Sequence, residues 1–171
     1  MTIVRTLEKI LGEEKTSSLV NNRAYKFCVD AIAMNVFSLS YAINEKFIAG
    51  MSWEETGKAR IAAAVGNTLT GRPYGIYRDY IMNKFHVSHE SSWLKKYALD
   101  VFVFATGQTP LYLCYLAAAG ADLPQMIKGA IFLTLVAPLT GRPQGITYDY
   151  CRRQFGTDET YCLKTEGKEG V

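Results

Sequence analysis

LTGRPYGI stands at residues 69–76 and LTGRPQGI at residues 139–146, an offset of 70 residues. The same offset aligns residues 23–85 with residues 93–155 without a gap, and 16 of the aligned positions are identical. Unrelated segments of this length would share roughly four identities at ordinary residue frequencies. The sequence therefore predicts an internal duplication, and each copy is expected to fold into the same helical unit.

One segment is apolar over a length that could cross a bilayer. Val101–Ala121 contains 21 residues and no charged side chain, and at about 1.5 Å per residue such a helix spans the hydrocarbon core. The apolar stretches at 31–44, 61–71 and 129–141 are shorter, and each alone would suit a core helix of a soluble protein. The duplication favours the membrane, because residues 31–48 are the counterpart of the long segment.

The predicted fold is all-α, a four-helix transmembrane bundle made of two two-helix repeats inserted in the same orientation. The expected helices cover residues 24–48, 53–83, 93–118 and 123–154. Pro73 and Pro143 fall inside the second and fourth helices. A proline there removes a backbone hydrogen bond, so we expect a kink at each.

Positive charge is distributed unevenly between the two ends of these helices. Of the 19 lysines and arginines, five lie in each of the ranges 1–26, 72–96 and 142–168, on the side of the termini. The positive-inside rule then places both termini in the cytoplasm. The expected segments are an amphipathic interfacial stretch at 1–22, repeat 1 at 23–86, repeat 2 at 93–156 and a flexible tail at 157–171.

Composition disfavours several classes of function. The net charge of +3, without a basic run, does not indicate a nucleic-acid partner. The four cysteines form no C-x-x-C pair, and His86 and His89 lack a third ligand, so we expect no metal and no cofactor. No nucleophile elbow, phosphate loop or paired catalytic carboxylates occur, and an enzyme is not predicted.

The strongest candidates for a binding site are two acid–base pairs, Asp30 with Arg72 and Asp100 with Arg142. Counted from the turn near residue 50, Asp30 lies 20 residues along one helix and Arg72 lies 22 along the other. Two residues correspond to about 3 Å, so both side chains should lie at similar depth. Such pairs could bind the carboxylate and ammonium groups of a zwitterion. Equally, they could fix helix packing, or the arginines could extend to the headgroups.

Other polar and small residues fall within the predicted spans. Asn67 and Gln108 are candidate lining residues of a polar path, although hydrogen bonding between helices is the commoner use of such side chains. The two proline motifs carry glycines four residues apart, a spacing that lets helix backbones approach closely. These glycines are Gly71, Gly75, Gly141 and Gly145. They predict a helix contact, either within the chain or between protomers.

Two further aspartates lie at the cytoplasmic ends of the returning helices. Asp79 follows Arg78, and Asp149 precedes Arg152 and Arg153. We interpret these groups as exposed interfacial ion pairs, which contribute little to stability.

Four motifs carry a resemblance to a known family. They are Ala49-Gly50-Met51-Ser52-Trp53-Glu54, Pro73-Tyr74-Gly75-Ile76-Tyr77-Arg78-Asp79, Ala119-Gly120-Ala121-Asp122 and Asp149-Tyr150-Cys151-Arg152-Arg153. In order and spacing, over residues 24–156, they resemble the bacterial L-alanine exporter family, AlaE. The resemblance implies a multi-pass protein of the inner membrane with four membrane helices, which exports L-alanine using the proton motive force. It also implies self-association through a glycine motif, here Gly141 and Gly145.

The predicted function is export of a small neutral amino acid across the inner membrane, with L-alanine as the substrate. Four helices are few to enclose an alternating-access path, so a homodimer in the lipid bilayer is expected. Two alternatives stay open: a channel or carrier for another small metabolite, and a membrane scaffold that transports nothing. A soluble enzyme is the fourth interpretation.

Overall fold

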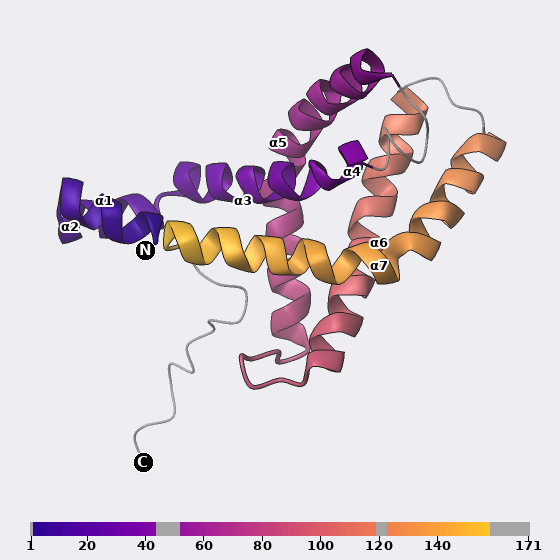
Figure 1. The fold of residues 1–171 in the computed structure, drawn as a ribbon. Coiled ribbons are helices and arrows are strands. Elements are labelled where there is room, and N and C mark those ends of the chain that lie inside the picture. The colour runs from indigo at the N-terminus through magenta and orange to yellow at the C-terminus, as the bar shows by residue number, and fades with distance from the viewer. Residues whose placement is uncertain (1, 44–51, 119–122, 158–171) are drawn as a thin grey trace.

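The computed structural model describes residues 2–43, 52–118 and 123–157 (Figure 1). In these ranges the chain forms helices and no strand, which confirms the all-α class. The helices are α1 (Ile3–Leu11), α2 (Glu13–Asn21), α3 (Arg23–Ser38), α4 (Ser40–Ile43), α5 (Trp53–Lys84), α6 (Trp93–Ala118) and α7 (Leu123–Phe155).

Three of the four predicted helices match α5, α6 and α7 to within one residue at each end. The first does not run unbroken over 24–48, because α3 ends at Ser38 and α4 begins at Ser40. The hydroxyl of Ser40 donates to the carbonyl of Phe37 at 2.7 Å and competes with the backbone ladder. The break is local, since Leu39 keeps helical dihedrals. Residues 44–51 and 119–122, where the hairpin turns were predicted, and residues 158–171 of the predicted tail lie outside the described residues.

The N-terminal segment forms two short helices, where one amphipathic helix was predicted. Gly12 separates α1 from α2 with φ +84°, a conformation that glycine adopts without strain. Helix α1 packs on the end of α7, where Gly156 lies against Val4. The hydroxyl of Tyr25 donates to the carbonyl of Phe155 at 3.0 Å. Helix α1 thus covers the end of α7, and the division of the chain into four segments stays a prediction.

Helices α5 and α6 run across α3 and α7, which lie side by side (Figure 1). Within the repeats α3 packs on α5 and α6 packs on α7, while α3 also lies along α7 between the repeats. The largest buried apolar cluster forms at this crossing, and its members are Ala33, Met34, Tyr74, Ile81, Val103, Tyr148 and Cys151. Pro73 and Pro143 lie inside α5 and α7 without ending them, and α7 changes direction along its length (Figure 1).

Glycines permit the close crossing within each repeat. A Cβ atom added to Gly71 would lie 2.8 Å from the Cα of Ala31, and one added to Gly141 would lie 2.7 Å from the Cα of Val101. Both distances are far below van der Waals contact, so any larger residue would separate the helices. The contacts at both glycines are within the chain, and self-association there stays a prediction.

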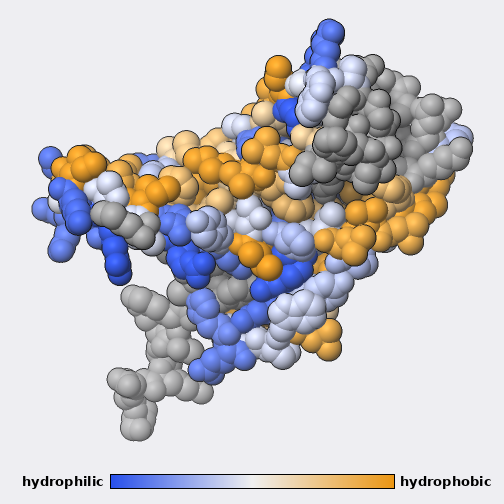
Figure 2. Space-filling view, in the orientation of Figure 1, coloured by the Kyte–Doolittle hydropathy of each residue, from blue (hydrophilic) through white to orange (hydrophobic). Residues whose placement is uncertain are grey.

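Large apolar side chains cover the outer surface of the long helices. Leu69 of α5 is 66% exposed and its counterpart Leu139 of α7 is 76% exposed. The exposed stripe continues through Ile61 and Val65 of α5 and through Ile131 and Leu135 of α7. Apolar side chains gather along the arm formed by α7 (Figure 2). Among the described residues, no helix is both long enough and apolar enough to cross a membrane.

Candidate functional site

Asp30 lies at the centre of the first of two ion clusters. Its carboxylate is 1% exposed and accepts from two arginines. Arg72, of the same repeat, donates through Nη1 at 2.8 Å. Arg152, of the other repeat, donates through Nε at 2.7 Å and through Nη2 at 3.0 Å, and its Nη1 reaches Asp79 at 2.6 Å. We call Asp30, Arg72, Asp79 and Arg152 cluster 1.

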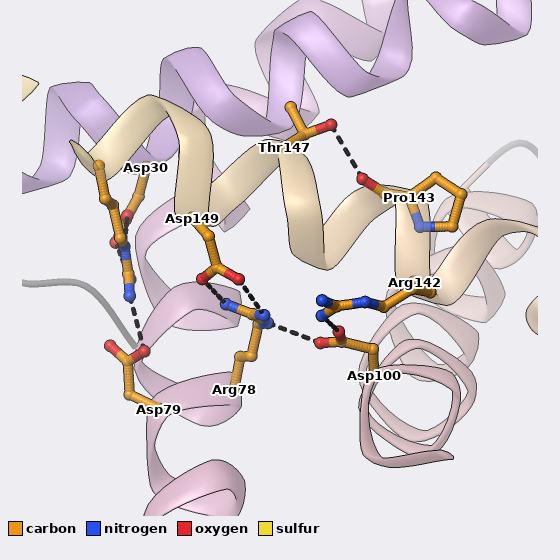
Figure 3. A network of polar contacts seen from close by, with 9 residues as sticks. Asp30, Arg78, Asp79, Asp100, Arg142, Pro143, Thr147 and Asp149 are labelled. Carbon is orange, nitrogen blue, oxygen red and sulfur yellow. Dashed lines mark hydrogen bonds and ion pairs between the residues drawn. The ribbon is translucent and has the colours of Figure 1, made fainter. Parts of the chain in front are cut away.

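Cluster 2 repeats this arrangement around Asp100. Arg142, of the same repeat, donates to Asp100 at 2.5 Å, and Arg78, of the other repeat, donates through Nε at 2.9 Å. Arg78 also holds Asp149 with a two-pronged contact, Nη1 at 2.7 Å and Nη2 at 3.1 Å. The guanidinium of Arg78 thus lies between two carboxylates (Figure 3). Cluster 2 is Asp100, Arg142, Asp149 and Arg78.

Each cluster contains two carboxylates and two guanidinium groups, so its formal charge is zero when all four are ionised. Asp30, Asp100, Arg78 and Arg152 are buried almost completely. A buried charge is tolerated only when it is paired and hydrogen-bonded, and removing one partner of such a pair costs about 3–5 kcal/mol. The two clusters therefore join the repeats by contacts that neither repeat can make alone.

The interpretation of Arg78 and Arg152 as exposed interfacial residues is wrong. Both side chains are buried, and their partners lie between 22 and 122 residues away in the sequence. Arg78 pairs with Asp149 and Arg152 pairs with Asp79, so both arginines reach across the repeat boundary instead of pairing with the adjacent aspartate. The helical spacing indicates that these arginines are buried. Arg78 follows Gly71 by seven residues, and Arg152 follows Gly145 by seven. Each arginine therefore shares the close-packed face of its helix.

Glycine also makes room for the two buried carboxylates. A Cβ atom added to Gly75 would lie 2.5 Å from Oδ2 of Asp30. A Cβ atom added to Gly145 would overlap the carboxylate of Asp100. The glycines four residues apart thus have separate tasks, one at the helix crossing and one beside the aspartate.

Tyr74 and Gln144 occupy equivalent positions and contact each other in the buried interior. The hydroxyl of Tyr74 donates to Oε1 of Gln144 at 2.9 Å, and both side chains are buried. Nε2 of Gln144 approaches the sulfur of Met34 at 3.1 Å. Gln108 approaches the same sulfur at 3.5 Å, which places this predicted lining residue beside the centre of the bundle rather than in a cluster.

Asn67 belongs to neither cluster. Its Nδ2 atom is buried and has no hydrogen-bond partner among the described residues. Since buried amide groups are nearly always satisfied, an unfilled donor at this place requires an explanation.

An open groove of about 570 Å³ lies between α3 and α5, on the outside of repeat 1. Its walls are mostly apolar. Two polar contacts cross it: Nδ2 of Asn35 donates to Thr68 at 3.3 Å, and Arg60 donates to the carbonyl of Ser38 at 2.6 Å. None of the eight cluster residues lines this groove.

The backbone of His86 adopts a left-handed conformation near the end of α5. It adopts φ +49° directly after α5, and the N–H of Val87 donates to the carbonyl of Met82 at 3.0 Å. Gly156, its counterpart by the 70-residue offset, adopts φ +72° after α7. Both positions end a helix in the left-handed conformation. Among the described residues no group of three potential ligands could hold a metal ion.

The L-alanine exporter family, AlaE, matches residues 19–158 and so includes both clusters entirely. The chain belongs to this family. Its family relatives include the L-alanine exporter AlaE of Escherichia fergusonii, 32% identical over 153 residues, which covers 89% of this chain and 99% of that protein. The L-alanine exporters AlaE of Citrobacter koseri and Escherichia coli K12 are each 36% identical over 127 residues, covering 74% of this chain and 85% of theirs. No solved structure matches. The predicted family resemblance is confirmed.

Proposed function

We propose that this protein exports L-alanine, or a similarly small neutral amino acid, across the inner membrane. The proposal is supported by family membership and by the two balanced ion clusters at the crossing of the helices. The observation that carries it is the pairing of each buried aspartate with one buried arginine and one more accessible arginine.

The distribution of side chains supports immersion in lipid. Charged groups such as Arg78 and Asp100 are buried, whereas leucine and isoleucine side chains cover the outside of α5 and α7. Water would favour the reverse arrangement, but a hydrocarbon medium favours this one. Clustering of lysine and arginine near the termini supports cytoplasmic placement of both ends.

The accessible arginines are the proposed sites for the substrate carboxylate. Arg72 is 28% exposed and Arg142 is 14% exposed, whereas Arg152 and Arg78 are enclosed. A substrate carboxylate can therefore take the place of Asp30 on Arg72 while Arg152 continues to neutralise Asp30. Guanidinium groups suit this exchange because they bind carboxylates through two parallel hydrogen bonds.

The outer aspartates are the proposed partners of the substrate ammonium group. Asp79 is 29% exposed, whereas both oxygens of Asp30 already accept from arginines. In cluster 2 the corresponding residue is Asp149. Gly75 and Gly145 lie directly against the buried carboxylates, where even an added Cβ atom would overlap, so a substrate side chain cannot occupy this space.

We propose that the proton motive force drives export. In Asp30 and in Asp100 both carboxylate oxygens accept from an arginine, so the proposed coupling requires that an arginine leave the carboxylate during the cycle before a proton binds there. The exchange of Arg72 between Asp30 and the substrate would provide this step.

The charge balance of the clusters also favours one alternative, a scaffold that transports nothing and uses the ion pairs for packing. Counterflow of labelled alanine in proteoliposomes, with a panel of competing amino acids, separates the two. An exporter exchanges alanine, and Arg72→Gln reduces the exchange although the protein remains folded. A scaffold shows no exchange with either protein.

A further inference from the structure

One set of equivalent positions in the two repeats carries very different side chains. In one place Phe37 of α3, Phe104 of α6 and Ala137 of α7 form a buried apolar cluster, with Leu133 packed against it. By the 70-residue offset their counterparts are Gly107, Met34, Asn67 and Ala63, in the same order. We call the first set the sealed flank and the second set the polar flank.

Side-chain volume and polarity both change between the flanks. The polar flank replaces a phenylalanine by glycine at position 107 and an alanine by asparagine at position 67. The sealed flank is closed by two phenylalanine rings, since Phe37 and Phe104 are buried together. The polar flank instead has smaller side chains of its own and adds the amide of Asn67, while the rings of Tyr74 and Tyr77 lie over Gly107. A few polar groups among apolar walls suit a small polar solute.

Contacts place the polar flank between α5 and α6. Gly107 of α6 lies against the rings of Tyr74 and Tyr77 of α5, and Tyr77 shares a hydrogen bond of 2.7 Å with Thr106. Asn67 precedes Tyr74 by seven residues, two helical turns, and so shares its face of α5. The sealed flank lies at the equivalent interface of α3 with α7, which run side by side (Figure 1).

Two amide donors at the polar flank also lack a strong hydrogen-bond acceptor. The Nδ2 donor of Asn67 is buried without a partner among the described residues. The nearby Gln108 amide meets only the sulfur of Met34 in the described contacts, a weak acceptor. A passing solute with carboxylate oxygens, or water that accompanies it, would satisfy both donors.

We infer that the transported solute passes along the polar flank alone, beside Asn67, Gly107, Gln108 and Met34, and that Phe37 and Phe104 close the equivalent route. This inference rests on the proposed transport function. The duplicated bundle contains two equivalent routes, and only the polar flank then serves as the path of the solute.

Matched cysteine substitutions test the path, because positions 67 and 137 are equivalent. The native Cys28, Cys114, Cys151 and Cys162 are first replaced, and alanine flux through the resulting protein is measured. Asn67→Cys and Ala137→Cys are then treated in membranes with a charged methanethiosulfonate reagent. Since modification of a thiol requires access from water, we expect it to be at least about ten-fold faster at position 67. Added alanine should slow the reaction at position 67.

A second pair of cysteine substitutions keeps the test decisive if one variant of the first pair does not fold. Met34→Cys should react and Phe104→Cys should not, because these positions are also equivalent. Equal rates within a pair, or faster reaction at 137 or 104, would overturn the inference. The modification rates and the alanine flux test the path and the proposed function separately. Selective modification at 67 or 34 in a protein without alanine flux would keep the path and refute the substrate, whereas flux with equal modification would refute the path and keep the substrate.

Discussion

The two ion clusters have the same composition but are not built from the same positions. Asp30 and Asp100 are equivalent by the 70-residue offset, as are Arg72 and Arg142. The arginines that cross between repeats are not, because the counterpart of Arg152 is Met82 and not Arg78.

The counterpart of Arg78 is Tyr148, one helical turn before Arg152. Tyr148 is buried and donates to the carbonyl of Gly71 at 3.0 Å. Each cluster nevertheless reaches a formal charge of zero. Charge balance in a buried site is thus retained while the position that supplies the charge differs between copies, since an unpaired buried charge is too costly to keep.

The largest expected effect follows from removing a crossing arginine. Arg152→Met installs the residue that stands at the counterpart position 82 and leaves Asp30 with Arg72 alone. We expect a loss of about 3–5 kcal/mol in the free energy of unfolding, because Asp79 and Asp30 both lose their buried partner. Chemical unfolding in detergent micelles measures it.

The control for that experiment is the next residue, Arg153, which is exposed. Arg153→Met should change the unfolding free energy by no more than about 0.5 kcal/mol. Equal losses for the two variants would show that cluster 1 does not depend on Arg152.

Substitution of a glycine beside a buried carboxylate should have the second largest effect. The added methyl group of Gly145→Ala overlaps the Asp100 carboxylate, so the ion pairs of cluster 2 must shift. We expect a loss of about 1–3 kcal/mol, as for other overpacked sites. The thermal unfolding of the purified protein reports it.

Gly57→Ala is the matched control, because nothing lies within 4 Å of its added Cβ in α5. There the substitution should stabilise by roughly 0.5–1 kcal/mol through helix propensity. A stable Gly145→Ala variant with unchanged alanine exchange would contradict the proposed role of the glycine.

A moderate effect is expected from removing an accessible arginine. Arg72→Gln leaves Asp30 paired with Arg152, so the cost in stability should be smaller, about 1.5–3 kcal/mol for one charged hydrogen bond. Alanine counterflow should fall more steeply than stability does. Comparison with Arg142→Gln shows whether the two clusters contribute equally, and unchanged flux in both variants would remove these arginines from the site.

The smallest effect concerns the ends of the helices. His86→Gly places after α5 the residue type that follows α7, and it relieves a left-handed conformation that L-residues adopt at a cost of roughly 1 kcal/mol. We expect stabilisation by about 0.5–1 kcal/mol in the same unfolding assay. Destabilisation would indicate that the His86 side chain makes a contact that outweighs the backbone strain.

Much of the fold follows from local patterns. The bounds of α5, α6 and α7 were predicted to within a residue, since apolar periodicity and the repeat act along the chain. The pairing of Asp30 with Arg72 was predicted from their similar distances to one turn, and the structure joins them. The break at Leu39 and the split of the N-terminal segment were missed, because a side-chain hydrogen bond and a glycine conformation decide them.

The sequence by itself determined the duplication, the all-helical class and the aspartate–arginine pair inside each repeat, because all of these depend on spacing along one hairpin. Only the tertiary structure decided that Arg152 meets Asp30, that Arg78 meets Asp100 and that Phe37 meets Phe104. These partners belong to different repeats. Their contact depends on how one hairpin is rotated against the other, a quantity that no spacing within a hairpin encodes.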